Sequence, residues 1–239
     1  HENFEVKIDA ATAAGGAATS AGGPTVADTT SPTAMSTNAT YGVDMIRAPE
    51  VWKEFDTRGE GATVAVLDTG IDPTHPDLNV SGWAEYDSNG NLVSEGPENA
   101  YDSNGHGTHI AGTVAGDNAS GTAIGVAPKA DLYGLKVLND DGGGTFAQVI
   151  AGMEHATANT SARILQMSLG KNGQFDEFIE PVQNARGAGK IVVASSGNSG
   201  NGTSSSPANV YESFAVGSVG EDRSVASFSG GETMNTSED

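Results

Sequence analysis

The sequence of 239 residues contains no cysteine, and it has only 11 lysine and arginine residues against 31 aspartate and glutamate residues. Without cysteine, a disulfide scaffold, a thiol nucleophile and a zinc–thiolate site are all excluded. The net charge of −20 disfavours nucleic acid as a partner, because binding to phosphates needs a basic face. No apolar run reaches 18 residues, so no membrane span is expected.

The start of the chain also lacks the basic and apolar segments of a signal peptide, so we expect that a signal peptide was removed or that the chain is a fragment. Residues 1–9 resemble the end of a folded element. Residues 10–40 are mostly Ala, Gly, Ser and Thr and predict a linker, because they cannot bury enough apolar area to fold. Six N-x-S/T sequons fit a secreted protein, at Asn38, Asn79, Asn118, Asn159, Asn201 and Asn235.

From Tyr41 onward the hydrophobic pattern is that of a folded domain. Strands are predicted over 62–67, 132–138, 163–169, 190–195 and 214–219, and helices over 106–115, 145–158 and 175–188. Residues 43–55 predict a short helix and a turn. Residues 78–104 are polar and predict turns. Alternating strands and helices indicate an α/β fold with three layers, a doubly wound, mostly parallel sheet with helices on both faces.

Three polar residues fall at or just beyond predicted strand ends, namely Asp68, Ser168 and Asn198. In such sheets the chemistry lies at the carboxyl ends of the strands, which indicates one shared site. Asp68 in Asp-Thr-Gly is common turn chemistry, and an aspartic protease would need a second copy that is absent. His106 and His109 fit either a polar helix start or, together with Asp68, a zinc site.

The longer motifs around Asp68 and His106 are too specific for a simple turn, a polar helix start or a zinc site. Asp-Thr-Gly-Ile-Asp at 68–72 and His-Gly-Thr-His-Ile-Ala-Gly-Thr-Val-Ala at 106–115 closely resemble the subtilisin family of serine proteases. Further matching motifs lie at 125–130, 135–138, 167–170, 192–198, 206–208 and 214–219. The resemblance covers residues 41–230, and the acidic composition is similar to that of the halophilic, halolysin-like branch.

The resemblance implies a secreted, extracellular serine endopeptidase with an Asp-His-Ser triad that needs no cofactor for its chemistry. Asp68 would be the buried carboxylate that orients His106, and His106 would be the general base and then the general acid. Asn198 would donate its amide to the oxyanion, an interaction worth about 3–4 kcal/mol in this class.

The resemblance also assigns substrate binding to two backbone segments, Gly142-Gly143-Gly144 and Ser168-Leu169-Gly170. An extended peptide would pair between them as an added strand, with Phe146 lining an apolar pocket. For the three glycines, a flexible loop is the alternative. Expected partners are peptide or protein substrates and the chain's own pro-region, which would act as an inhibitor or chaperone. The enzyme is expected to be a monomer.

A structural calcium ion is a further implication of the resemblance. Asp77 resembles a calcium ligand of the family, and 117–123 is the matching loop. The expected asparagine ligand falls on Ala119, which leaves Asp117 or Asn118 as substitutes. Calcium requires six to eight oxygen ligands.

The nucleophile is missing from the resemblance, because no Gly-Thr-Ser-Met-Ala motif occurs. Ser204 follows Gly-Thr but lies six residues after Asn198 and precedes no apolar helix, which disfavours it. We therefore expect a pro-region tail and linker over 1–40 and a C-terminally incomplete peptidase domain over 41–239. Expressed alone, the chain should be inactive and poorly folded, because apolar faces of the sheet would stay exposed. Burying apolar surface stabilises a fold by about 25 cal/mol per Å². A non-catalytic peptide-binding domain is the alternative.

Overall fold

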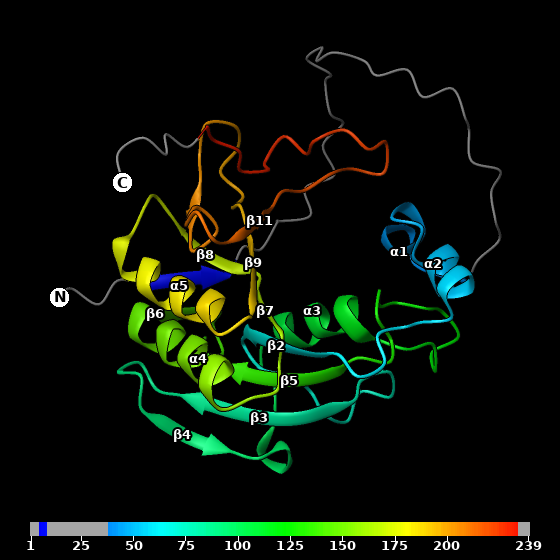
Figure 1. Cartoon of the computed structure of the whole chain (residues 1–239), viewed down its shortest axis with the longest axis horizontal. Coiled ribbons are helices and arrows are strands. Elements are labelled where there is room, and N and C mark those ends of the chain that lie inside the picture. The colour runs from blue at the N-terminus through cyan, green and yellow to red at the C-terminus, as the bar shows by residue number, and fades with distance from the viewer. Residues whose placement is uncertain (1–4, 9–37, 234–239) are drawn as a thin grey trace.

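The centre of the fold is a seven-stranded sheet with the strand order β11-β9-β7-β2-β5-β3-β4 (Figure 1). The computed structural model describes residues 5–8 and 38–233. The strands are β2 (Thr63–Asp68), β3 (Val80–Tyr86), β4 (Leu92–Glu95), β5 (Asp131–Lys136), β7 (Ile164–Met167), β9 (Ile191–Ser195) and β11 (Phe214–Val216). Neighbouring strands are parallel, except that β4 runs antiparallel to β3.

Alternate residues of β2 enter two different hydrophobic clusters, because successive side chains of a strand point to opposite faces. Val64 and Val66 pack with residues of α3 (His106–Ala115), whereas Ala65 and Leu67 pack with residues of α4 (Phe146–Ala158) and α5 (Ile179–Gly187). The sheet therefore has helices on both faces. The predicted three-layer, mostly parallel α/β fold is confirmed.

The first part of the domain differs in detail from the prediction. The short helix and turn expected over 43–55 are two helices, α1 (Tyr41–Met45) and α2 (Ala48–Phe55), separated by Arg47 in the left-handed region at φ 62°. Short 3₁₀ turns are η1 (Pro97–Asn99) and η2 (Asp176–Phe178). Of the linker predicted over 10–40, all but 38–40 lies outside the described residues. None of the described helices is long and apolar enough to cross a membrane.

The prediction of turns throughout 78–104 is wrong, since this segment contributes β3 and β4 to the sheet. Polar residues and glycine interrupt the apolar pattern of β3, which hides the strand in the sequence. In the fold Trp83 and Ala84 are fully buried. The turn between the two strands is closed by the Asp87 carboxylate, which accepts hydrogen bonds from the backbone of Asn89 and Asn91.

A second, smaller sheet has the order β10-β8-β1-β6. Its strands are β1 (Glu5–Ile8), β6 (Gly143–Thr145), β8 (Leu169–Asn172) and β10 (Ser205–Ser206). Strand β1 runs antiparallel to both β6 and β8. Residues 5–8 thus complete a sheet whose other strands come from the domain itself.

Candidate active site

Asp68 and His106 form the centre of the site. Asp68 ends β2 and His106 begins α3, and Asp68 Oδ1 lies 2.7 Å from His106 Nδ1. The Asp68 side chain is fully buried, whereas 17% of the His106 side chain is exposed. A buried carboxylate at this distance binds Nδ1 of the histidine, so that Nε2 is the nitrogen that can exchange a proton with another group.

The backbone around Asp68 fixes the position of its carboxylate. Oδ1 also accepts a hydrogen bond from the backbone nitrogen of Thr69 at 2.7 Å, and the carbonyl of Asp68 accepts from the nitrogens of Val137 and Leu138. Oδ2 is buried and has no hydrogen-bond partner within the described part of the chain. The carboxylate is therefore held through Oδ1, and its hydrogen-bonding capacity is only partly used among the described residues.

The close approach of α3 to the end of β2 depends on Gly107. A Cβ atom at this position would lie 2.1 Å from the carbonyl oxygen of Gly70 and 3.1 Å from Cβ of Asp68. The amide of Gly107 instead donates to Thr69 Oγ1 at 3.0 Å. Only glycine allows the first turn of the helix to lie against the strand end, and this contact brings His106 to Asp68.

Asn198 follows β9, two strands away from β2 in the same sheet. Both residues therefore extend from the carboxyl ends of parallel strands, at one edge of the sheet. The Asn198 side chain is half-buried. Gly197 before it adopts φ 96°, in the left-handed region that favours glycine, and so makes the turn that follows the strand.

The two segments predicted to bind substrate lie on either side of a slot one strand wide. Val6 pairs with Gly144 of β6, and Lys7 pairs with both Gly143 of β6 and Gly170 of β8. The slot is filled by β1 of the same chain. An extended peptide can thus pair with both segments at once through backbone hydrogen bonds.

The individual residues of these segments have different parts in the slot. Gly142 and Ser168 lie just before the two strands rather than within them. Gly144 cannot carry a side chain, because a Cβ atom would lie 2.6 Å from the carbonyl of Val137. Phe146 is buried in the same hydrophobic cluster as Val6. The glycine segment is thus an ordered strand and its preceding turn, not a flexible loop.

Ser204 is engaged away from His106. Its hydroxyl donates to Glu232 at 2.8 Å and accepts from the side-chain amide of Asn209 at 3.1 Å. Its backbone carbonyl accepts from Gly173 beside β8. These contacts make Ser204 part of the loop that supports β10.

The loop predicted to hold calcium does not offer the required set of oxygen ligands. Asp77 is buried, and its Oδ1 accepts a hydrogen bond from the backbone of Ala119, whereas Oδ2 has no partner among residues 5–8 and 38–233. The Asp117 carboxylate is paired with the Lys129 ammonium at 2.6 Å. With Asp117 neutralised by Lys129, the Asp77 and Asp117 side chains supply far fewer than the six or more oxygens that calcium needs.

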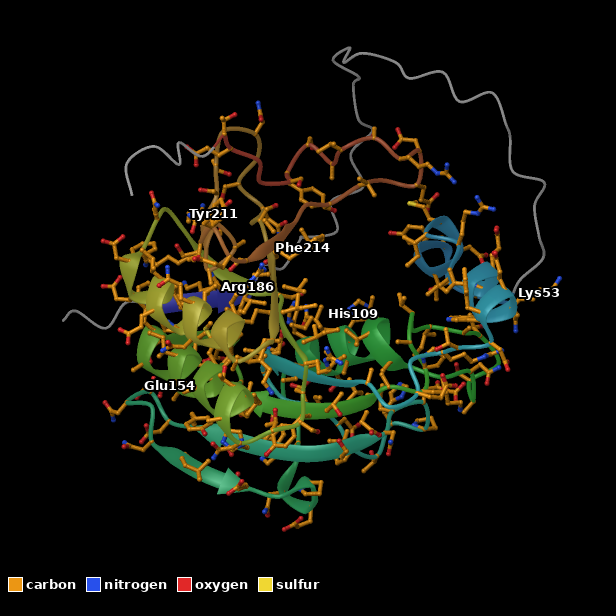
Figure 2. All side chains as sticks on the ribbon, viewed as in Figure 1. Lys53, His109, Glu154, Arg186, Tyr211 and Phe214 are labelled. Atoms are coloured by element: carbon orange, nitrogen blue, oxygen red, sulfur yellow. The ribbon has the colours of Figure 1, made fainter. Side chains whose placement is uncertain are left out.

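A metal site built from Asp68, His106 and His109 finds no support. No group of three or more His, Cys, Asp or Glu side chains suited to a metal ion occurs in the ranges that the structure describes. His109 lies on the exposed surface of α3 (Figure 2). The zinc alternative raised by the sequence therefore has no geometric basis.

Lys136 is a buried residue at the site that the sequence reading did not single out. It is the register partner of Asp68 in β5, and its ammonium donates to the carbonyls of Thr69 and Leu138 and to the carboxylate of Asp140. A lysine at the end of an apolar strand was the available signal, because lysine is rarely buried without partners. It ties the backbone after Asp68 to the loop before β6.

Comparison with known proteins gives a consistent family assignment. Residues 59–237 match the model of the subtilase family. The alkaline protease of Alkalihalobacillus alcalophilus is 40% identical over 197 residues, which cover 82% of this chain and 49% of that protein. Subtilisin Savinase of Lederbergia lenta is 41% identical over 189 residues, or 79% of this chain and 66% of that protein. The chain spans about half the length of the first of these relatives and about two thirds of the second.

Proposed function

Because the chain belongs to the subtilase family, we propose that it supplies the aspartate, the histidine and the oxyanion-binding amide of a serine endopeptidase. The observation that carries this proposal is the 2.7 Å contact between the buried Asp68 carboxylate and His106 Nδ1. In this role the carboxylate holds the proton on Nδ1, so that Nε2 accepts the proton of a serine hydroxyl as that hydroxyl attacks the peptide carbonyl. No metal or organic cofactor takes part.

Asn198 completes the chemistry on this proposal. Its side-chain amide donates to the oxygen that becomes negative when the carbonyl is attacked. Its place after β9, at the same sheet edge as Asp68, supports this role. Protonated His106 then gives its proton to the leaving amine, and the acyl group remains on the serine. Water attacks this acyl-serine with His106 again as the general base, which releases the acid and restores the serine.

The serine itself is expected from polypeptide that follows Asp239. The family's Gly-Thr-Ser-Met-Ala motif is absent from the 239 residues, and the chain covers 49% of the alkaline protease it resembles. Strand β11 is an outermost strand of the large sheet, and its side chains Phe214 and Val216 are 66% and 44% exposed. These exposed apolar side chains support the presence of further polypeptide that packs beside β11. On its own the chain is inactive; with the downstream polypeptide, here termed the extended protein, it hydrolyses peptide bonds.

Strand β1 supports both the mode of substrate binding and the part played by the pro-region. Substrates bind as β1 does, in an extended form between β6 and β8. Residues 1–9 are then the tail of a pro-region that blocks its own active site until it is removed. Residues 10–40 are then the link between this tail and a domain that begins near Tyr41. The enzyme acts as a monomer.

The setting of the reaction is proposed from composition and family resemblance. A net charge of −20 and a pI of about 4.3 fit a secreted enzyme of a saline medium. Carboxylates repel one another less where salt screens them. This makes the chain similar to the halolysin-like branch of its family.

A non-catalytic peptide-binding domain is the second candidate, favoured by the filled slot between β6 and β8. The two functions differ in their need for Asp68 and His106, since backbone pairing alone binds a peptide. A domain that only binds has no use for a buried carboxylate against a histidine.

The test is peptide hydrolysis by the extended protein, together with labelling by a serine-directed fluorophosphonate. We expect hydrolysis and labelling in the parent protein and loss of both in His106→Ala, by a factor of about 10³ or more. Ser204→Ala is the matched control and should retain both. Peptide binding without hydrolysis or labelling would favour the binding domain, and loss of activity in Ser204→Ala would overturn the assignment of the nucleophile.

A further inference from the structure

The carboxylate of Asp102 accepts five hydrogen bonds at the start of α3. Oδ1 accepts from the backbone of Asn104 at 3.1 Å and Gly105 at 2.9 Å, and from Thr69 Oγ1 at 3.0 Å. Oδ2 accepts from the backbone nitrogen of Thr108 at 2.9 Å and from its hydroxyl at 2.7 Å. Both oxygens therefore hold groups that lie within two residues of His106 on either side.

Thr69 makes this cluster a bridge between two parts of the active site. Its backbone nitrogen donates to Asp68 Oδ1 at 2.7 Å, and its hydroxyl donates to Asp102. The same hydroxyl accepts from the backbone of Gly107, the residue after His106. The loop before α3, the first turn of α3 and the end of β2 are thereby joined through one carboxylate and one hydroxyl.

The environment of Asp102 favours its charged form. Burial acts to raise its pKa, but the hydrogen bonds from Thr108, Gly105 and Thr69 outweigh this and hold the pKa below its usual range. In the described ranges no lysine or arginine forms a salt bridge with it. Its negative charge is stabilised by the donors at the N-terminus of a ten-residue helix.

Other aspartates show what a purely local turn looks like. Among the described residues, Asp87 accepts from Asn89 and Asn91, within its own hairpin. Asp222 likewise accepts from Ser224, two residues along the chain. Asp102 differs because it also reaches Thr69, 33 residues away along the chain and directly after the strand that ends in Asp68.

We propose that Asp102 is a positioning residue that sets the hydrogen bond between Asp68 and His106, an inference that rests on the peptidase function proposed above. By holding Thr69 and the first turn of α3 together, it fixes the distance and the angle between the carboxylate and the imidazole. The sequence carries the signal in Asp102-Ser103-Asn104-Gly105-His106: an aspartate shortly before a helix start is a capping pattern.

The test compares the extended protein with its Asp102→Asn variant. The amide has one acceptor oxygen in place of two and directs N–H groups at the donors of the cluster. We expect kcat to fall about 10²-fold, because small misplacements of reacting groups have effects of this size. KM should change little, since β6 and β8 form the peptide slot. Spectra with ¹⁵N-labelled histidine should show a smaller population of the Nδ1–H tautomer of His106.

Thr69→Val and Thr69→Ser give a second, independent test. Valine removes the bridging hydroxyl at nearly constant volume and should reproduce the losses in kcat and in the Nδ1–H tautomer, whereas serine should restore both. Asp87→Asn is the matched control for loss of a turn carboxylate and should change neither. Unchanged tautomer populations in Asp102→Asn and Thr69→Val would overturn the proposal, even if both variants lowered the melting temperature. A parent protein without hydrolysis would refute the peptidase function, while the tautomer comparison would still decide the role of Asp102.

Discussion

The hydroxyl of Tyr86 lies 2.7 Å from Nδ1 of His155, and the hydroxyl of Tyr133 lies 2.9 Å from Nε2 of the same ring. The three side chains join α4 to β3 and β5. Burial lowers the pKa of His155, against an opposing effect of Glu95, and burial raises the pKa of Tyr86 to about 12. In this state the neutral imidazole donates to one phenol and accepts from the other.

This arrangement predicts that the free energy of unfolding decreases as the pH falls below about 6.5, the ordinary pKa of histidine. Because the pKa of His155 is lowered in the folded state, the unfolded chain binds the proton more readily at acid pH. The contribution of neutral His155 to the free energy of unfolding is complete above pH 6.5 and is lost as the pH falls toward the pKa of His155 in the folded state. Urea unfolding of the extended protein between about pH 5 and 7 measures it.

His155→Gln should flatten this pH dependence, because glutamine keeps a donor and an acceptor but does not titrate. His109→Gln replaces an exposed histidine and is the control. Its free energy of unfolding should change with pH as that of the parent does. Equal slopes for the parent and His155→Gln would show that another group controls acid unfolding.

The sequence predicted the parts of the fold that have strong periodicity. Ala62 to Leu67 is a continuous apolar run and forms β2, and the 106–115 pattern forms α3. It did not predict β3, because Ser81, Gly82 and Glu85 break the apolar alternation and only packing against β5 makes this segment a strand. Long-range pairing of this kind leaves little trace in local composition.

The site was predictable to a similar degree. The contact between Asp68 and His106 follows from two motifs, each at an element end. The sequence contains a capping pattern at Asp102 and a lysine at the end of an apolar strand at 136, but it does not show that both residues contact Thr69. The pairing of β1 with β6 and β8 was likewise hidden, because its four residues lie far from both strands in the chain.

The exposed apolar surface at the edge of the large sheet predicts a difference between the chain and the extended protein. Tyr211 is 78% and Phe214 66% exposed, on the segment that leads to and forms β11 (Figure 2). The 239-residue chain should bind a hydrophobic dye such as ANS and self-associate, whereas the extended protein should do neither. Dye fluorescence and light scattering measure these outcomes.

Phe214→Ser distinguishes this surface from exposed apolar residues elsewhere. It should reduce dye binding by the chain and destabilise the extended protein by about 1.5–3 kcal/mol, the value of burying such a side chain. Leu92→Ser, on the far edge strand β4, should not destabilise the extended protein, because Leu92 is exposed already. Equal effects of the two substitutions would show that β11 remains uncovered.

The acidic surface predicts that salt raises stability. At a net charge of −20 the carboxylates repel one another, and the Debye length falls from about 10 Å at 0.1 M salt to about 3 Å at 1 M. The melting temperature of the extended protein should rise over this range of KCl. A triple variant with glutamine at the exposed Glu154, Glu180 and Glu221 should show a weaker dependence. A melting temperature independent of KCl in the parent would contradict a halophilic protein.

The contacts of Asp77 and Asp117 predict that calcium does not stabilise the protein. Lys129 neutralises Asp117, and Ala119 provides no side-chain oxygen. Addition of about 5 mM EDTA should leave the melting temperature unchanged, since only binding to the folded state shifts it. Lys129→Ala frees the Asp117 carboxylate and serves as the comparison. A higher melting temperature with calcium in the parent protein would show that the loop rearranges into a site.

The burial of Val6 predicts that a peptide of residues 1–9 inhibits the extended protein after removal of the same residues from the enzyme. Val6 is fully buried beside Phe146, whereas Lys7 is exposed. Exposing an apolar side chain of this size costs about 1.5–3 kcal/mol, or roughly 10- to 100-fold in binding.

Val6→Asp in the peptide should therefore weaken competitive inhibition at least 10-fold, since a carboxylate would enter an apolar site, whereas Lys7→Ala should have a smaller effect because it truncates an exposed side chain. Inhibition constants from hydrolysis of a chromogenic peptide decide between the two. If the two variants lost equal affinity, or if the parent peptide did not compete, backbone pairing between β6 and β8 would not be the way in which this chain recognises its own N-terminal segment. The contrast between Val6 and Lys7 is informative because both residues pair with β6, so that any difference must come from the side chains.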